Sequence, residues 1–428
     1  GAPPPALHSV SFVSRRFSKQ SKKMVFCFTN FFSSTPKPNE ELNIHVIFKP
    51  LYTLITIFGL FPYSIKFQKI TNRYLILPKT IFINSAWVIT ILLVLYIFIY
   101  IHWQYLYYWT GPSDITEGIM IKSNYVVIIA ALAIVCTVAY TSSFLNRYRY
   151  VKILNKIASI YAEVNNDNSQ RILSSLRFQI NFVILGSIVF IILLQVCVNF
   201  TRQPVDLWKM VLVIITFNLP QTVQIVYLYF YYALVIMVVF VLRSLNDQML
   251  RLKGKKPTIA NVIIVPKEHC ATLGDIERVY VRAIAIKNDI NEAFQATILV
   301  TTLQCLHCTV SNAYLIYRGL VTGSSNAHTL VNTCIWLGYQ FLKIYLLASS
   351  GNALKNEVCS CLPFRERGGQ YGMKLNMPQV QHFSSLMLYQ DTGLSIYGYF
   401  SLDATLISTM VATVTTYLTI CVQFGVRN

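Results

Sequence analysis

Eight stretches of the chain are almost free of charged residues and are long enough, or nearly so, to cross a lipid bilayer, which takes about 20 apolar residues in a helix. They cover residues 46–65, 81–106, 120–145, 174–199, 208–242, 295–317, 327–349 and 394–424. The first stretch contains Lys49, Pro50, Gly59 and Pro62, which break a clean span and favour a re-entrant or interfacial segment. The pattern therefore predicts an all-α membrane protein in which a re-entrant segment precedes seven transmembrane helices.

The composition agrees with a membrane protein, because 54% hydrophobic and 12% charged residues give more apolar surface than a soluble core could bury. The net charge of +19 is spread over the connectors between apolar stretches and does not indicate nucleic-acid binding. Every second connector is rich in Lys and Arg, namely 66–79, 147–156, 243–256 and 355–374. Since the N-terminal arm is basic too, the positive-inside rule predicts a cytoplasmic N-terminus and an extracellular C-terminus.

The ten cysteines are scattered, mostly inside apolar stretches, so a disulfide framework is not expected. Cys305, His307 and Cys308 are close in sequence, but no second such group follows, which favours structural packing over a metal site. The sequence has no nucleophile elbow, P-loop, zinc-binding H-E-x-x-H or paired carboxylates with catalytic spacing. We therefore expect no enzyme activity, no cofactor and no metal.

The last apolar stretch carries a line of polar residues. At 100° per residue, six of them fall within a stripe roughly 120° wide, and these are Thr405, Thr409, Thr413, Thr416, Thr419 and Gln423. The hydroxyls could bond to the preceding turn or to a neighbouring helix. Alternatively the stripe could line water, which requires copies of the chain around an axis in a closed cyclic oligomer. With Asp403 at its start and no Lys or Arg, such a path would favour cations, and Phe424 could form its gate.

The tail TYLTICVQF, residues 416–424, resembles the C-terminal signature of insect gustatory receptors: Thr-Tyr, five mostly hydrophobic residues, then Gln-Phe. Also similar to that family are GLFP at 59–62 and YGYFSLDATLIST at 397–409. The resemblance covers most of the chain in architecture, while only the tail is specific in sequence.

The resemblance implies a ligand-gated, non-selective cation channel in the plasma membrane of sensory neurons, binding a small-molecule tastant. It implies a homotetramer, or an assembly with related subunits, in which the last helix of each subunit lines a central pore. Gln423 and Phe424 would then form the gate, with Thr413, Thr416 and Thr419 along the pore. Leu418 stands where sugar receptors often have an acidic residue, which favours a bitter or other non-sugar plant compound. A sugar-sensing receptor channel stays open as an alternative.

In such a fold the ligand pocket lies among the outer halves of the second to sixth spans. Polar and aromatic residues at that depth need partners and form our candidate ligand-binding set: Tyr125, Asn218, Gln221, Gln304, His307, Ser311, Asn332, Trp336, Tyr339 and Gln340. Gln224 belongs to a wider set of polar residues at the same depth. These groups suit a small, neutral, partly apolar plant compound or a sugar, although each could instead form a hydrogen bond between helices.

The chain is expected to divide into five parts. Residues 1–45 form a disordered basic arm in which Met24 is a candidate natural start, and 46–65 form the re-entrant segment. A six-helix ligand-binding domain occupies 81–349, with cytoplasmic helix extensions within 243–294 that either pack against 373–390 or stay solvated. Residues 350–393 form a cytoplasmic anchor segment, and 394–428 form the pore-lining last helix.

Two other classes of membrane protein are alternatives. A G-protein-coupled receptor is suggested by NRYRY at 146–150, but Asn146 replaces the acid of the Asp-Arg-Tyr motif and no late span holds Asn-Pro-x-x-Tyr. A secondary transporter is suggested by the polar groups at membrane depth, but apart from Asp403 the spans lack acids, and no internal repeat is visible.

Overall fold

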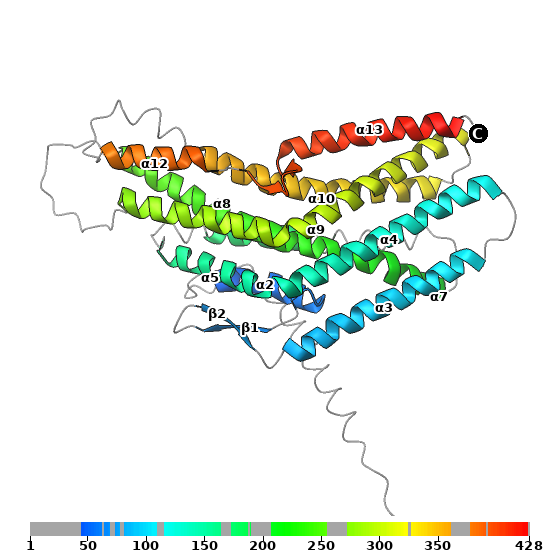
Figure 1. The fold of residues 1–428 in the computed structure, drawn as a ribbon, viewed down its shortest axis with the longest axis horizontal. Coiled ribbons are helices and arrows are strands. Elements are labelled where there is room, and N and C mark those ends of the chain that lie inside the picture. Colours follow the sequence, from blue (N-terminus) through cyan, green and yellow to red (C-terminus); the bar gives the residue numbers. More distant parts are fainter. Residues whose placement is uncertain are drawn as a thin grey trace, which may run out of the picture.

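The computed structural model describes residues 44–61, 64–68, 73–77, 81–108, 115–163, 173–186, 189, 207–254, 272–323, 327–360, 377–390 and 393–426. Within these ranges the chain is mostly helical and forms two short antiparallel hairpins (Figure 1). In chain order the elements are α2 (Ile44–Ile57), β1 (Ser64–Gln68), β2 (Arg73–Leu77), α3 (Ile81–Tyr108), α4 (Ile115–Leu145), α5 (Arg147–Glu163), α7 (Leu207–Val213), the π-helical turn η2 (Ile214–Asn218), α8 (Leu219–Gly254), α9 (Leu273–Thr322), α10 (Ala327–Ser360), α12 (Met377–Tyr389), β3 (Ser395–Ile396), β4 (Phe400–Ser401) and α13 (Ala404–Val426).

Among the described residues, six helices are long and apolar enough to cross a membrane. These spans are Ser85–Tyr105, Ser123–Leu145, Met210–Leu250, Leu273–Val321, Ala327–Ser360 and Ala404–Gln423. They correspond to six of the seven predicted crossings. The remaining one, at 174–199, is helical through residue 186, and most of the rest lies outside the described residues. The all-α membrane fold is thus confirmed, while its sidedness stays a prediction.

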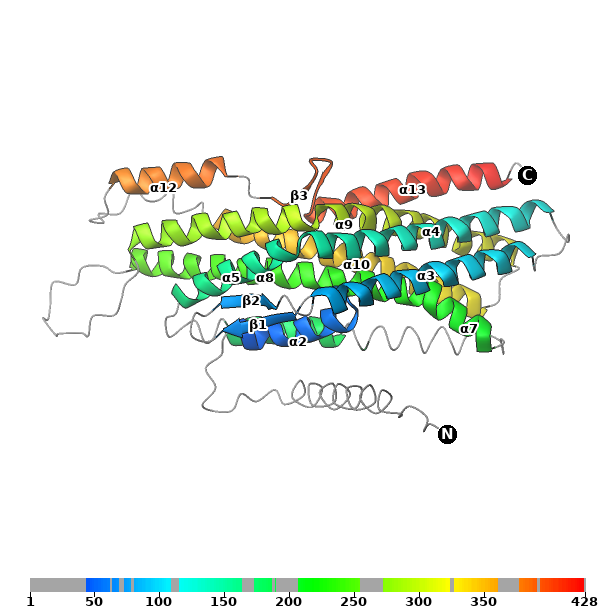
Figure 2. The same cartoon turned by 60° about the horizontal axis from the view of Figure 1, so that its bottom comes forward.

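The first apolar stretch folds as the 14-residue helix α2, with Pro50 inside it. At 1.5 Å per residue this helix is about 21 Å long, shorter than the bilayer core of about 30 Å. Beyond a turn in which Gly59 has a φ of 70°, the chain enters the β1–β2 hairpin. Asn155 of α5 holds that hairpin by accepting from Tyr74 N at 2.6 Å and donating to Tyr74 O at 3.1 Å. Figure 2 shows α2 and the hairpin beside α5.

The centre of the molecule is α8, whose residues from Val223 to Leu242 are buried on every side. A helix that is apolar all round is stable only when other elements enclose it. Rings from α2, α5, α8 and α9 meet beside it, with Phe230 and Phe294 at centroid distances of 5.1 and 5.2 Å from Tyr150. This aromatic core ties the short N-terminal elements to the long helices.

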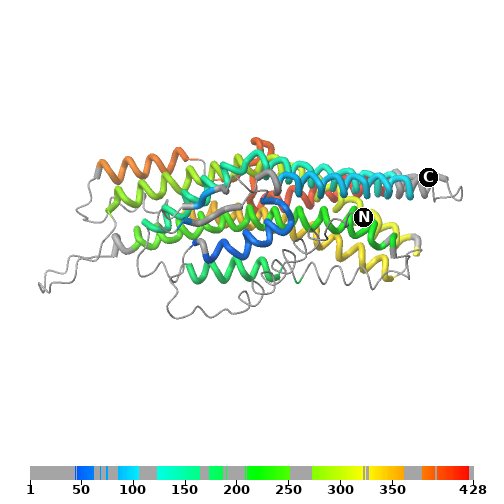
Figure 3. Tube along the Cα trace, turned by 90° about the horizontal axis from the view of Figure 1, so that it is seen from below, coloured from blue at the N-terminus to red at the C-terminus, as the bar shows by residue number. Residues whose placement is uncertain are grey.

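Three helices continue well past the membrane-crossing length. With 50 residues, α9 is about 75 Å long at 1.5 Å per residue, and α8 and α10 extend beside it. The short helix α12 packs on the first part of α9, where the rings of Tyr280 and Phe383 lie 5.5 Å apart and His382 Nδ1 lies 3.0 Å from Glu277. In Figure 3 α12 and the C-terminal end lie at opposite ends of an elongated molecule.

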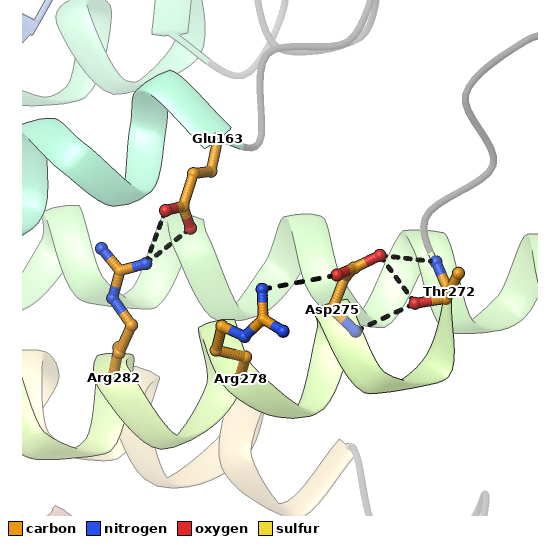
Figure 4. Close-up of polar contacts among 5 residues, drawn as sticks. All are labelled: Glu163, Thr272, Asp275, Arg278 and Arg282. Carbon is orange, nitrogen blue, oxygen red and sulfur yellow. Dashed lines mark hydrogen bonds and ion pairs between the residues drawn. The ribbon is translucent and has the colours of Figure 1, made fainter.

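The start of α9 is fixed by a capping box (Figure 4). Thr272 Oγ1 accepts from Asp275 N, and the Asp275 carboxylate accepts from Thr272 N, each at 3.2 Å. This reciprocal pair satisfies two backbone donors that no helical carbonyl can reach. A few residues on, Arg282 holds both Glu163 oxygens, at 2.7 and 2.6 Å, and so joins α9 to the end of α5.

The last helix begins later than predicted. Residues 395–401 form the β3–β4 hairpin, and α13 starts at Ala404 instead of residue 394. Tyr397 and Gly398 reverse the chain with φ values of 48° and 75°, a left-handed conformation that suits a tight hairpin turn and cannot continue a helix. Asp403 then caps α13, because its carboxylate accepts from Thr405 N at 2.9 Å.

Candidate functional site

The last helix has two opposite faces. Leu406, Met410 and Val414 are 4%, 7% and 9% exposed, and this face packs on α9 and α10. On the other side, all the polar residues of the predicted stripe are exposed except the half-buried Thr413. Phe424 belongs to α13, but its side chain lies outside the described residues. The predicted pore residues Thr416, Thr419 and Gln423 therefore face away from the rest of the chain.

The hydroxyls of this stripe bond to their own helix. Four of them donate to the carbonyl four residues earlier, at 2.9 Å from Thr409, 2.8 Å from Thr413, 3.0 Å from Thr416 and 2.9 Å from Thr419, while the Thr405 hydroxyl donates to the Asp403 carboxylate. A hydroxyl oxygen that has given its proton inward keeps two acceptor lone pairs. The exposed stripe thus presents oxygen acceptors, which are suited to water and cations and do not attract anions.

Deep in the bundle, polar side chains of α8, α9 and α10 form one cluster. Gln221, Gln224, Gln304 and Gln340 are 4%, 1%, 2% and 1% exposed. Gln224 donates to Gln304 at 2.9 Å, and the Tyr339 hydroxyl donates to the Gln221 backbone oxygen at 2.9 Å. The predicted ligand-binding residues Gln221, Gln304 and Tyr339, and Gln224 of the wider polar set, thus form hydrogen bonds between helices.

Lys343 lies at the centre of this cluster and was missing from the predicted site. It is 0% exposed, and its Nζ donates to the side-chain oxygens of Gln221, of Gln224 at 2.5 Å, and of Gln340 at 3.1 Å. Nζ also lies 4.4 Å from the centroid of the Tyr339 ring. The signal available in the sequence was a lone lysine within the stretch 327–349, one helical turn after Tyr339 and Gln340 and hence on their face.

Towards the start of α10 the predicted residues are less enclosed. Trp336 is half-buried, and its ring meets Tyr339 edge-on at 5.7 Å. His307 Nε2 and Asn332 Oδ1 are enclosed atoms without a hydrogen-bond partner among the described residues. Since a buried polar atom without a partner costs about 1–3 kcal/mol, these two are the atoms in this region best placed to take a bond from a ligand.

Three further predicted residues sit towards α3 and α4. Ser311 donates to Asn124 of α4 at 2.8 Å. Tyr125 packs on Phe217 with centroids 4.9 Å apart, and Asn218 ends the π-helical turn η2. The structure therefore places Tyr125, Asn218 and Ser311 at the margin of the cluster rather than within it.

The π-helical turn was not predicted from the sequence, although Pro220 just after it was a signal. Proline lacks an N–H and clashes with the preceding turn, so the helix widens locally. Just after the turn, the Thr222 hydroxyl donates to the carbonyl of Asn218 at 2.7 Å. Single π-helical turns occur often at functional sites, and this one lies at the start of α8, a few residues before Gln221.

A second set of contacts holds the start of the last helix. We call residues 393–403 the linker hairpin. Lys287 and Asn291 of α9 donate to its backbone oxygens at Gly393 and Ser395, at 2.7 and 2.8 Å. From α10, Lys355 Nζ lies 2.8 Å from Asp403, and the backbone of Leu402 fills the space that a side chain on Gly351 would take.

Between the polar cluster and the linker hairpin, α13 does not pack completely against α9 and α10. An apolar cavity of about 180 Å³ lies among α9, α10 and α13, and Ile344, Tyr345, Met410 and Val414 are among its lining residues. Well-packed interiors hold few voids larger than a water molecule, so the packing of α13 against α9 and α10 is incomplete at this point. The described residues hold no group of three or more His, Cys, Asp or Glu side chains that could bind a metal ion.

The fold resembles solved insect olfactory receptors. The structure of olfactory receptor OR5 from Machilis hrabei has a TM-score of 0.63 at 12% identity, and its complex with eugenol has 0.61 at 14%. Each comparison covers 89% of this chain and 98% of the receptor. At this level of identity the likeness shows the fold alone.

In sequence, the chain is similar to Gustatory receptor 68a of Drosophila melanogaster, with 29% identity over 123 residues. That match covers 27% of this chain and 31% of the Drosophila receptor, so the chain spans about a third of the length of this relative. A family model described as 7tm Chemosensory receptor matches residues 48–428. Because this match includes nearly all of the sequence, the chain belongs to the 7tm chemosensory receptor family.

Proposed function

We propose that the chain is a subunit of a ligand-gated, non-selective cation channel that serves as a gustatory receptor for a small, non-sugar plant compound. Four copies surround an axis in the plasma membrane of sensory neurons, and α13 of each copy lines the pore. Gln423 and Phe424 form the gate, and the threonines on the same face line the path.

The observation that carries this proposal is the exposure of the threonine stripe opposite the packing face of α13. A helix in lipid gains nothing from a continuous line of oxygen atoms, whereas a water-filled path needs one. One exposed stripe cannot enclose such a path, so the proposal requires a cyclic oligomer.

Ligand gating is supported by the two sites that share α10. The polar cluster includes Gln340 and Lys343 of α10. The linker hairpin, which directly precedes α13, packs on the same helix at Gly351. A ligand that binds better to one arrangement of α8, α9 and α10 shifts the equilibrium towards that arrangement. The apolar cavity beside α13 gives the pore helix space to follow. The similar receptor OR5 has been solved with eugenol, a small molecule, which supports a ligand of that size here.

The test is to express this chain alone and record whole-cell currents during application of a panel of plant compounds and sugars. We expect an inward cation current that persists when Na⁺ is replaced by K⁺. Gln423→Ala and Phe424→Ala should change gating or conductance, whereas Trp336→Ala should raise the half-effective ligand concentration.

Trp103→Ala is the matched control for Trp336, because Trp103 is a tryptophan of α3 with 51% of its surface exposed. Currents that keep their gating and conductance in both Gln423→Ala and Phe424→Ala, at normal surface expression, would refute the proposed pore.

A further inference from the structure

The polar cluster holds a positive charge that is not neutralised by any acid of the described residues. No Asp or Glu among them lies within 4.0 Å of Lys343 Nζ. Its partners are the three neutral amide oxygens of Gln221, Gln224 and Gln340. An ammonium has three N–H donors. Each donor of Lys343 therefore has an acceptor, but its positive charge has no negative counterpart among the described residues.

An uncompensated charge at membrane depth is costly, and ionisable residues there mark functional sites. Amide dipoles lower this cost but do not remove it, because a buried ion is stabilised best by an opposite charge with good geometry. A carboxylate makes a shorter and stronger bond to an ammonium than a neutral amide does. In the low dielectric of the bundle this difference grows further.

Aromatic and amide side chains surround Lys343. Trp336 precedes it by seven residues on α10, which is about 10 Å along the helix axis and matches the length of a small aromatic or short aliphatic acid. Tyr339 and Gln340 lie between the two on the same face. On α9, His307 lies one turn beyond Gln304, and its Nε2 is enclosed without a partner among the described residues.

We propose that the ligand of this receptor is a small carboxylic acid whose carboxylate binds Lys343 Nζ and whose apolar body extends towards Trp336. The carboxylate replaces the side-chain oxygen of Gln340, which at 3.1 Å is the longest of the three bonds and comes from the same helix. The bonds from Lys343 to Gln221 and Gln224 keep α10 joined to α8. This inference rests on the proposed receptor function and replaces the neutral ligand expected from the sequence.

The experiment compares acids with their uncharged esters on the full chain. The probes are salicylate and methyl salicylate, cinnamate and methyl cinnamate, and decanoate and methyl decanoate, applied at neutral pH, where the acids are ionised. Two readouts are taken: whole-cell current, and the unfolding temperature of the purified protein in detergent. For at least one pair we expect the acid to act at a concentration about tenfold or more below that of its ester, as a charge-assisted bond predicts.

Two substitutions separate charge from packing. Lys343→Arg keeps a cation and should retain the preference for the acid. Lys343→Met keeps the length but removes the charge, so the acid should need an about tenfold higher concentration, while the ester response stays within about twofold. Because Lys343→Met leaves amide oxygens buried without a donor, it could fail to reach the surface. The wild-type acid and ester comparison then decides by itself.

The proposal would be overturned if, in all three pairs and in both readouts, the ester acted at the same concentration as its acid or at a lower one. A preference for the acid that survives in well-expressed Lys343→Met would overturn it as well. If other compounds open the channel while all three acids neither act on the current nor stabilise the protein, the carboxylate inference fails and the proposed function stands. If no compound evokes a current, the proposed function fails and this inference falls with it.

Discussion

The tightest contact between α10 and the linker hairpin is at Gly351, and Gly351→Ala tests whether this contact couples the bundle to the last helix. A Cβ on Gly351 would lie 2.7 Å from the Leu402 carbonyl carbon and 3.2 Å from its Cβ, with the carbonyl oxygen closer still. Ordinary contacts of this kind begin at 3.4 Å, so the carbonyl carbon alone must retreat by about 0.7 Å. The obstacle is backbone, which cannot move aside as the end of a flexible side chain can.

The cost of this shift follows from what surrounds it. Overpacking a tight contact costs about 1–3 kcal/mol. The displacement also stretches the ion pair of Lys355 with Asp403, which adds less than about 1 kcal/mol because Lys355 is 45% exposed and screened by solvent. We therefore expect Gly351→Ala to destabilise the protein by about 1–3 kcal/mol relative to the same substitution at an unobstructed helical glycine, and to change the largest ligand-evoked current per receptor at the surface.

Gly338→Ala is the matched control, because Gly338 lies on the same helix and a Cβ there would meet nothing within 4 Å. Alanine stabilises a helix interior by about 0.8–1.0 kcal/mol relative to glycine, so this control should be neutral or slightly stabilising. The assay measures unfolding temperature in detergent and whole-cell current normalised to surface-labelled receptor. Equal unfolding temperatures and equal normalised currents for the two variants would refute the coupling described for Gly351.

Two other sites give sharp expectations. Hydrogen bonds from Lys355 and then Thr405 lower the pKa of Asp403 to about 2. The Asp403 carboxylate therefore stabilises the fold above about pH 4, and this stabilisation is lost as the pH falls towards 2. The unfolding temperature of the wild type should drop over that range, and that of Asp403→Asn should drop much less. At pH 7, Asp403→Asn loses the ion pair with Lys355 but keeps a capping oxygen, and it should cost about 1 kcal/mol or less. Asp403→Ala also loses the cap and should cost about 1 kcal/mol more. Identical unfolding temperatures for the two variants would argue against capping. Asn155→Ala removes both bonds to the backbone of Tyr74 and should cost about 1–3 kcal/mol, seen as faster hydrogen exchange at residues 73–77, and unchanged exchange would contradict that role.

The spans could be predicted because the bilayer imposes length and apolarity on every crossing helix. The first stretch could be set apart because Gly59 ends its helix after only 14 residues, whereas Pro50, also expected to break it, lies inside α2. The outward face of α13 was also visible in the sequence, since its threonines lie opposite Leu406, Met410 and Val414. In each case the signal lies within a single segment.

The centre of the candidate site could not be predicted in this way. The rotation of α8 about its axis decides which side chains meet α10, and beyond Gln224 the buried part of this helix is apolar all round, so its pattern does not show which neighbour faces the glutamines. Gln221 and Gln224 reach Lys343 across 122 and 119 residues of sequence. Likewise, Asp403 was visible as a lone acid, but its partner Lys355 belongs to another helix. Such pairs depend on how two helices pack, which no single segment specifies.

The polar cluster and the linker hairpin are joined by one stiff element, α10, through which binding at the cluster would be transmitted to α13, the proposed pore helix. Gly351 follows Lys343 by eight residues on α10, which is about 12 Å along the axis, and this part of the helix contains no proline. A helix with intact hydrogen bonds moves as a unit over that length, so any movement of α10 at Lys343 displaces Gly351 too. Because the backbone of Leu402 rests directly on Gly351 and α13 starts two residues later, the displacement reaches α13 without a flexible link. Coupling of this kind is a free energy shared by two sites. A ligand that acts at Lys343 should therefore change the unfolding temperature of Gly351→Ala by a different amount than it changes that of Gly338→Ala.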